Sequence, residues 1–313
     1  MDMKKKKNIY KKENNEVEKI KVEKVHSPEM LVLMRVKKNK LAMVGFGILI
    51  IMILFCVVGP ILTPYEQETM NFAMKKQPPS FAHWFGTDLI GRDILTRLMY
   101  AGRVSLLVGF VAVIIEIAIG GILGAIAGYY GGIVDSIIMR IVDIFLCIPF
   151  LPILIILGAM LSDLDVDPNK RIFFVMFIIG ILSWPTIARL VRGQILSLRE
   201  QEFMQAAEAL GLTDSRKIFK HLLPNVVPSI IVSATLGIGG AIMTESALSY
   251  LGMGVAPPNA SWGNMIQSVN NFADLMERPW LWVPPGVCIF LTVMAINLLG
   301  DGLRDALDPK LKK

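Results

Sequence analysis

The side chains that most often carry out catalysis are present in this sequence, but their spacing does not fit a catalytic site. The three histidines, His26, His83 and His221, lie far apart, and none belongs to an H-E-x-x-H or H-x-E pattern of the kind that binds zinc. No serine stands in G-x-S-x-G. The dipeptide Gly-Lys is absent, so the chain lacks a Walker A loop for nucleotide phosphates. We therefore expect a protein that is not an enzyme.

The three cysteines give no sign of a metal site or a disulfide framework. Cys56, Cys147 and Cys288 each lie in a different apolar segment, without C-x-x-C or Cys/His spacing. We expect them to pack as small apolar side chains. The chain itself is therefore expected to hold no metal and no cofactor.

Ionisable residues inside apolar segments are the next candidates, because a charge within a membrane is costly and usually functional. Glu116 and Glu245 each stand in such a segment. Both are candidates for lining or gating a pathway, and hydrogen bonding inside a helix bundle is the alternative for Glu116. Arg140 and Asp143 stand at positions i and i+3, where they are expected to form a structural ion pair.

A charged stretch over residues 202–225 reads EFMQAAEALGLTDSRKIFKHLLPN and interrupts the apolar segments. Apolar side chains recur in it at i, i+3, i+4 and i+7, which predicts a helix with one apolar face. These side chains are Phe203, Ala206, Ala207 and Leu210. Gly211 fits a helix stop, and Asp214 or Ser215 fits the N-cap of a second helix. The pattern predicts a short helix–turn–helix that could dock on a partner, although a generic amphipathic surface helix fits it equally well.

Membrane-spanning helices must position these residues. Of the 313 residues, 54% are hydrophobic and 19% are charged, and the mean hydropathy is +0.56, which indicates an integral membrane protein. A helix that spans a bilayer takes roughly 20 mostly apolar residues. Six segments qualify: 41–62, 104–127, 139–161, 172–191, 226–251 and 281–300. We expect an all-α integral membrane protein with six transmembrane helices.

The distribution of basic residues predicts the orientation of these spans. The net charge is +6, and lysine and arginine are concentrated in the first forty residues and in the link 192–220. This distribution argues against nucleic-acid binding. It favours both termini inside the cell, with residues 1–40 as a disordered basic tail, 303–313 as a second cytoplasmic tail and 63–102 as an extracellular segment.

The extracellular segment is expected to contain an interfacial helix. Asp88, Arg92 and Asp93 could pair at helical spacing, and aromatic residues such as Trp84 suit the lipid–water interface. Contact with an extracellular binding protein is the alternative role of this segment.

Glycines at small-residue spacing predict a close helix contact in the second span. They are Gly120, Gly121, Gly124 and Gly128. Glycines at such positions let two helix backbones approach each other in a membrane.

The stretch 202–225 resembles the cytoplasmic coupling loop of ATP-binding cassette (ABC) importer permeases. Their signature is Glu-Ala-Ala, three residues, Gly, nine residues and Ile-x-Leu-Pro. The residues in register with it are Ala206, Ala207, Gly211, Leu223 and Pro224. Gln205 replaces the signature glutamate, which leaves Glu202 or Glu208 to supply a carboxylate. His221 stands where the general signature has isoleucine, as is usual in the peptide-permease branch.

Other stretches extend the resemblance over nearly the whole chain. They are HWFGTDLIGRDILTRLMYAGRVSL, GYYGGIVDSIIMRIVDIFLCIP, TESALSYLGMGVAPPNASWGNMI and LLGDGLRDALDPK. All are similar to segments of dipeptide, oligopeptide and nickel permeases, and within that branch to the second, C-type subunit. The resemblance implies the type I ABC importer fold, with both termini inside and a permease domain over 103–302.

The resemblance also implies a coupling site and its partners. In this family the short helix docks into a cleft of a separate ATPase, and the loop here covers 197–225. The implied coupling residues are Glu202, Phe203, Gln205, Ala206, Ala207, Glu208, Leu210, Gly211, His221, Leu223 and Pro224. The implied partners are a homologous permease subunit, two ATPase subunits that hold ATP and Mg²⁺, an extracellular solute-binding lipoprotein and the lipid of a prokaryotic cell membrane.

The implied function is that of the permease subunit of an ATP-driven oligopeptide or dipeptide importer. Import of nickel or another small solute is the alternative within the same family. A secondary transporter or a membrane scaffold is the alternative from another class, although neither requires a docking helix on the inside.

Overall fold

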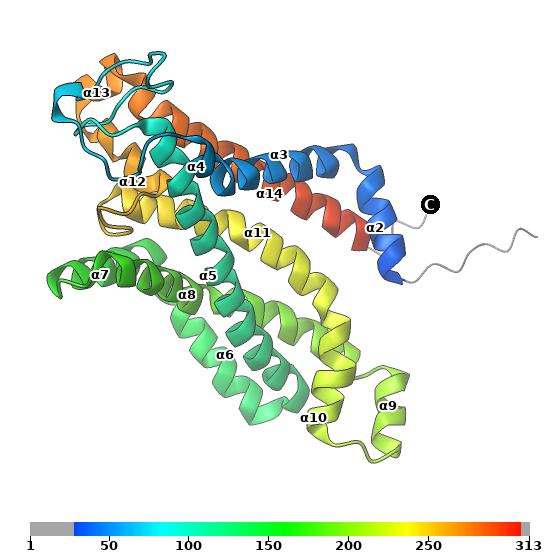
Figure 1. Ribbon diagram of the computed structural model, residues 1–313. Helices are drawn as coiled ribbons and strands as arrows, with labels where there is room; N and C mark the ends of the chain where they lie inside the picture. The colour runs from blue at the N-terminus through cyan, green and yellow to red at the C-terminus, as the bar shows by residue number, and fades with distance from the viewer. Residues whose placement is uncertain (1–27, 308–313) are drawn as a thin grey trace, which may run out of the picture.

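The computed structural model describes residues 28–307, which form helices joined by turns and loops (Figure 1). The α-helices are α2 (Pro28–Lys38), α3 (Lys40–Val57), α4 (Gly59–Leu62), α5 (Ile94–Tyr130), α6 (Gly132–Cys147), α7 (Phe150–Asp163), α8 (Pro168–Leu198), α9 (Glu202–Ala209), α10 (Asp214–Arg216), α11 (Leu223–Tyr250), α12 (Trp262–Ile266), α13 (Phe272–Glu277) and α14 (Val283–Leu307). A π-helical turn, η2 (Lys217–Leu222), joins α10 to α11, and 3₁₀ turns lie at Phe72–Met74, Gln267–Asn270 and Pro279–Leu281. The prediction of an all-α protein is confirmed.

Five helices are long and apolar enough to cross a membrane. They are α3, α5, α8, the continuous helix Asp214–Tyr250 and α14. Helices α6 and α7 satisfy the same criteria as a pair, but they are bent by 80° relative to each other. Counting this pair as one span gives the six that were predicted, and the third predicted span, 139–161, is divided between α6 and α7. The break falls where Ile148 has an extended backbone, because the ring of Pro149 disfavours a helical conformation at the preceding residue.

The remaining helices differ from the predicted spans mainly at their ends. Helix α5 begins at Ile94 rather than at 104, and α8 extends beyond 172–191 in both directions. Helix α14 continues to Leu307, so the first part of the predicted tail 303–313 is helical, and residues 308–313 lie outside the described chain. Hydropathy locates the apolar centre of a span, but a helix can continue with polar residues into the headgroup and aqueous regions.

The most extensive helix contact joins α5 to α8, through glycines of α5. A Cβ atom placed on Gly120 would come within 2.6 Å of the carbonyl oxygen of Trp184, and one on Gly124 within 2.5 Å of that of Ala188. Gly128 approaches the carbonyl of the next turn of α8 in the same way. The predicted glycine contact is confirmed at these three positions. Gly121 is the exception, because a Cβ atom there would meet nothing within 4 Å.

The N-terminal part of the chain is more ordered than the sequence suggested. Residues 28–38 form α2, so the prediction of a disordered tail over 1–40 is wrong for this part, while residues 1–27 lie outside the described chain. Asn39 caps α3 by accepting hydrogen bonds from the N–H groups of its first turn. Arg35 donates to the carbonyl oxygen of Ala306 at 3.1 Å, near the end of α14. A helix C-terminus has unpaired carbonyls, and arginine satisfies one here.

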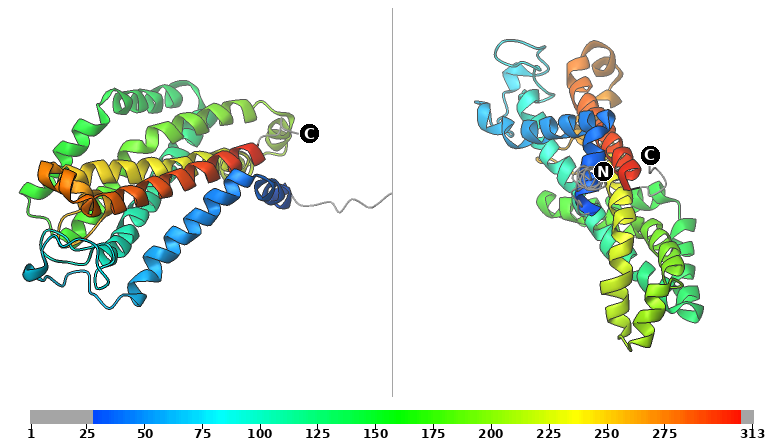
Figure 2. Two further views of the ribbon diagram at one scale, coloured as in Figure 1. Left: turned by 90° about the horizontal axis from the view of Figure 1, so that it is seen from above. Right: turned by 90° about the vertical axis from the view of Figure 1, so that its right-hand side faces the viewer.

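The bundle has two distinct ends (Figures 1 and 2). At the first, here called the coupling end, lie α9, α10, α2 and the end of α14. At the other, the outer end, lie the loop 63–93 and the short helices α12 and α13. The loop 63–93 contains a single 3₁₀ turn and no α-helix, so within the predicted segment 63–102 only residues 94–102, the start of α5, are α-helical.

Candidate coupling site

The segment 202–225 forms two helical pieces separated by a tight turn at the coupling end of the bundle (Figure 1). Helix α9 ends at Ala209, and Gly211 follows with a φ of +67°. The N–H of Gly211 donates to the Glu208 carbonyl at 2.9 Å, and the N–H of Leu212 to the Ala207 carbonyl at 3.2 Å. Bonds of this kind satisfy the last carbonyls of a helix and favour glycine in the left-handed position. The predicted stop at Gly211 is confirmed.

The second piece begins one residue earlier than expected and has no break before the next span. Thr213 occupies the N-cap position, and Asp214 is already helical, so the prediction of Asp214 or Ser215 as the cap is wrong. From Asp214 the helix continues through η2 into α11, and the whole stretch Asp214–Tyr250 is one helix. Helix α10 is therefore the first turn of the same continuous helix that contains α11.

The apolar residues of α9 divide between two faces. Ala207 is only 4% exposed, and Met204 is 3% exposed in a core cluster with Ile218 and Leu222 of η2. The prediction that placed Ala207 with the other apolar residues on one docking face is therefore wrong. Met204 was not among the predicted residues, although it stands three residues before Ala207 and so shares its face.

The outward face of α9 is free within the described chain. Phe203 is 37% and Leu210 79% exposed, and Ala206 lies exposed between them. Gln205 is exposed and its side chain makes no hydrogen bond among residues 28–307. The remaining predicted coupling residues are placed as follows: Glu202, Glu208, Gly211 and Pro224 are exposed, and His221 and Leu223 are half-buried. Most of the predicted set is therefore accessible to a partner, as a docking surface requires.

One buried lysine ties this segment to the bundle. The Lys217 side chain is 9% exposed, and its Nζ lies 3.2 Å from Asp214 and 3.7 Å from Glu208 of α9. The same ammonium group lies 5.6 Å from the ring centre of Tyr129, near the end of α5, within cation–π range. The Tyr129 hydroxyl also donates to Asp214 at 2.6 Å. Neither Lys217 nor Tyr129 was predicted from the sequence, because Tyr129 is far from residues 208–217 in the chain.

Arg192 of α8 and Arg199, which caps the end of α8, add further contacts at this end of the bundle. Arg199 donates to the carbonyls of Gly128 and Tyr129 at 3.2 Å each, which satisfies the C-terminus of α5. Arg192 forms a two-pronged contact with Asp135 of α6, with N–O distances of 2.7 and 2.5 Å. Planar pairing of this kind fixes orientation as well as distance.

The predicted ion pair between Arg140 and Asp143 is wrong. Asp143 pairs instead with Arg189 of α8 at 2.5 Å, and Arg140 makes no ion pair among the described residues. Asp143 and Asp135 lie along one side of α6, opposite two arginines of α8 that are three residues apart. The cationic partner of Asp143 therefore comes from the neighbouring helix α8, and not from its own helix α6 as the spacing had suggested.

The two membrane glutamates have different surroundings. Glu116 of α5 is 9% exposed and has no hydrogen bond or ion pair within the described chain. Glu245 of α11 is completely buried, and it accepts from Ser249 at 2.6 Å and from Ser105 of α5 at 3.1 Å. The Ser105 hydroxyl in turn accepts from the N–H of Trp262 at the start of α12. Glu245 thus joins α11, α5 and the outer end, while a pathway role for either glutamate stays a prediction.

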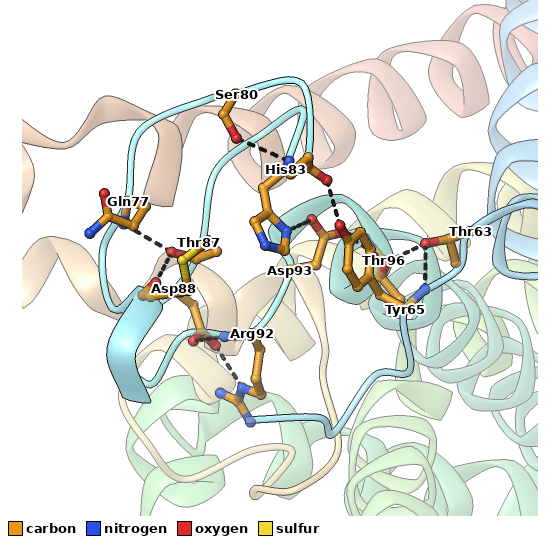
Figure 3. A network of polar contacts seen from close by, with 12 residues as sticks. Thr63, Tyr65, Gln77, Ser80, His83, Thr87, Asp88, Arg92, Asp93 and Thr96 are labelled. Atoms are coloured by element: carbon orange, nitrogen blue, oxygen red, sulfur yellow. Dashed lines mark hydrogen bonds and ion pairs between the residues drawn. The ribbon is translucent and has the colours of Figure 1, made fainter. Parts of the chain in front are cut away.

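Polar contacts of a different kind hold the loop at the outer end (Figure 3). Asp93 caps α5 by accepting from the N–H and hydroxyl of Thr96, at 2.8 Å each, and its other oxygen lies 2.9 Å from Nδ1 of His83. Asp88 pairs with Arg92 at 2.7 Å. The predicted pairing of Asp88 with Arg92 is confirmed, but it lies in a turn rather than in a helix.

A buried aspartate links this loop to α13. Lys76 lies 3.0 Å from both oxygens of Asp274, and Arg278 contacts the same carboxylate. Burial alone would raise the pKa of Asp274, but the hydrogen bonds from Lys76 and Arg278 outweigh it and hold the pKa below the ordinary value. The ionised carboxylate is therefore the form that joins the two halves of the outer end.

Comparison with known families identifies two matching stretches. The family described as "Binding-protein-dependent transport system inner membrane component" matches residues 120–313. The family described as "N-terminal TM domain of oligopeptide transport permease C" matches residues 27–79. Both α9 and the ties formed by Lys217 lie within the first match.

Individual relatives match over most of their length. The chain is 42% identical over 281 residues to the oligopeptide transport system permease protein OppC of Bacillus subtilis, covering 90% of this chain and 89% of that protein. It is 44% identical over 286 residues to the dipeptide transport system permease protein DppC of Alkalihalophilus pseudofirmus, covering 91% of each. It is also 40% identical to OppC of Haemophilus influenzae, over 87% of this chain and 86% of that protein.

Proposed function

The chain belongs to the family of binding-protein-dependent transport system inner membrane components, and we propose that it is the permease subunit of an ATP-driven importer of oligopeptides or dipeptides. Membership of this family confirms the resemblance expected from the sequence, and the helices make it a multi-pass membrane protein. The names of its relatives support a peptide substrate over nickel or another small solute.

The observation that carries this proposal is the two-faced helix α9. Its inner face packs on the bundle through Met204 and Ala207, and its outer face leaves Phe203 and Leu210 exposed. An exposed apolar face on a short, firmly attached helix fits docking into a cleft of another protein. The partner would be an ATPase subunit that binds ATP and Mg²⁺, since this chain has no Walker A loop.

The connections of α9 suggest how such docking acts on the membrane helices. Lys217 joins α9, α10 and the end of α5, and α10 continues through η2 into α11. When two ATPases close on ATP, a displacement of α9 would move α5 and α11 together. Motion of rigid elements around a membrane pathway is the physical basis of alternating access.

The proposed assembly has further members. A homologous permease would complete the pathway, and an extracellular lipoprotein would deliver the peptide at the outer end. The coupling end would face the cytoplasm of a prokaryotic cell, with both termini inside, in agreement with the lysines near α2.

Reconstitution tests this proposal. The chain is placed in proteoliposomes with the other members of the proposed assembly: the homologous permease, the two ATPases and the binding protein. Uptake of a radiolabelled tripeptide is then compared with uptake of ⁶³Ni²⁺. We expect peptide uptake that requires ATP. Uptake of nickel alone would assign the other branch of the family, and peptide uptake that persists without ATP but follows a proton gradient would indicate a secondary transporter.

A further inference from the structure

A cavity of about 800 Å³ opens at the outer end of the bundle. It lies between the loop 63–93 and the segment that runs from Pro257 to Leu281. Its walls carry charged, amide and apolar side chains together. Cavities of a few hundred to a thousand Å³ with a few convergent polar groups are typical of sites for small ligands.

The two carboxylates of the cavity wall are already neutralised by cations of the protein. Asp88 accepts from two backbone N–H groups and from Nε of Arg92 at 2.7 Å. Asp274 is held by Lys76 at 3.0 Å and by Arg278. Both carboxylates therefore already hold cations of the protein at 3.0 Å or less, and Asp88 reaches Arg97 only at 3.6 Å.

Of the cations on the cavity wall, Arg97 has the longest ion-pair distance. It stands in the first turn of α5 and is only 6% exposed. Among the described residues, Arg97 donates a hydrogen bond to the Gln67 carbonyl at 3.5 Å and forms a long ion pair of 3.6 Å with Asp88, whose oxygen is shared with Arg92. Glu68 also interacts with it electrostatically. A guanidinium has five N–H donors, and a buried charge is costly unless it is closely paired. The Arg97 side chain thus has N–H donors without a hydrogen-bond acceptor in the described chain, and it lies on the wall of an open cavity.

The guanidinium group of Arg97 indicates which chemical group a ligand of this cavity would carry. Its planar fork matches a carboxylate, which it binds through two parallel hydrogen bonds. Beside it, Ile94 and Leu281 offer apolar wall, and Gln267 and Asn270 have side-chain amides that make no hydrogen bond within the described chain. Such a lining suits a ligand that combines a carboxylate with amide groups and apolar side chains.

We propose that this outer cavity binds the free C-terminal carboxylate of a peptide, with Arg97 as its partner, before the peptide enters the membrane pathway. The proposal rests on the proposed function, since it takes the transported solute as the ligand. It adds a recognition site within the permease itself. Peptides whose C-terminus is blocked would then be poor ligands at this position.

The test uses the permease pair with its ATPases in lipid nanodiscs, without the binding protein. Saturation-transfer difference NMR measures the binding of trialanine, of its C-terminal amide and of N-acetyl-trialanine. We expect binding of trialanine and N-acetyl-trialanine, and a dissociation constant about tenfold or more weaker for the amide. Arg97→Gln should remove this difference, whereas Lys75→Gln, which changes an exposed lysine of the same loop, should preserve it.

Further measurements keep the proposal falsifiable. Thermal melts check that Arg97→Gln folds, and Arg97→Lys, which keeps the charge, should retain part of the preference for the free acid. Equal binding of acid and amide by the unchanged protein would overturn the proposal. In a separate docking assay with the binding protein added, the proposal would also fail if Arg97→Gln weakened only the docking of that protein, because the carboxylate would then belong to it.

This outcome is distinct from failure of the proposed function. ATP-driven peptide uptake without any preference for the free acid in nanodiscs would overturn the cavity site alone. Preference for the acid without ATP-driven uptake would overturn the importer function alone.

Discussion

The two ends of the bundle are held together in different ways. At the outer end, the charges of Asp274 and Asp93 are buried against partners from the loop 63–93. At the coupling end, α9 contacts the bundle through a few apolar residues and Lys217, and the side chains of Phe203 and Leu210 face outward. A region whose buried charges are paired with one another within the chain is expected to be rigid. A region that leaves an apolar face free fits the proposal that another protein covers it and moves it.

The largest effect should come from placing a charge on the inner face of α9. Ala207→Asp would bury a carboxylate at a position that is 4% exposed, without a designed partner. An uncompensated buried charge costs about 3–5 kcal/mol of stability. We expect a clear fall in the melting temperature of the purified protein, together with loss of uptake. Unchanged stability would show that α9 is not packed as described.

The same substitution one residue earlier should affect function without affecting folding. Ala206 is exposed, so Ala206→Asp should change stability by less than about 0.5 kcal/mol. At the centre of a docking surface it should weaken ATPase binding and uptake about thirtyfold or more. Co-purification of the ATPases and peptide uptake measure this, with Ala206→Ser as the control that keeps a small, uncharged side chain. Normal uptake by Ala206→Asp would argue against docking through this face.

A smaller effect is expected from cutting the tie between the docking helix and the bundle. Lys217→Gln removes the cation that joins Glu208, Asp214 and Tyr129. The ATPases should still bind, because the outward face of α9 is unchanged. Transport per ATP hydrolysed should fall about fivefold, a typical coupling effect.

The control for that experiment is a neighbouring lysine. Lys220→Gln changes an exposed lysine that makes no ion pair within the described chain, and it should leave coupling intact. Equal effects of the two variants would mean that Lys217 has no special role in transmission.

The smallest effect concerns the outer end and depends on pH. Because the folded pKa of Asp274 lies below its ordinary value of 3.8, its ionised form stabilises the protein above that pH. The contribution is lost as the pH falls through the folded pKa. We expect the gap in melting temperature between the unchanged protein and Asp274→Asn to shrink from about pH 6 to about pH 3.

An exposed aspartate outside these contacts provides the comparison. Asp163→Asn at the end of α7 should show no such gap at either pH. A gap for Asp274→Asn that is the same at both pH values would contradict the ion pairs at the outer end.

A structural feature could be predicted from the sequence where its cause lies in the residues at that position. Gly211 predicted the end of α9, because the required left-handed backbone favours glycine whatever surrounds it. Gly120, Gly124 and Gly128 predicted a close helix contact. The break at Pro149 was not predicted, although the proline was visible, because membrane helices often tolerate proline without a sharp bend.

The errors at the coupling end share one cause. Helical spacing groups Phe203, Ala206, Ala207 and Leu210 on one side of α9, but only contact with η2 decides that Ala207 turns inward with Met204. The pairing of Asp143 with Arg189 rather than Arg140 likewise depends on which helix lies opposite α6. Spacing along one helix carries no information about the neighbouring one.

The sequence by itself determined the number of apolar segments, the place of the charged segment between the fourth and fifth of them, and the family to which the chain belongs. These depend on hydropathy, local backbone preference and motif order, all of which are properties of neighbouring residues. Only the tertiary structure decided which face of α9 is free, that Lys217 ties it to Tyr129, and that Arg97 has only a long ion pair beside a cavity. Burial and pairing depend on residues far apart in the chain, and the packing of the helices brings them together.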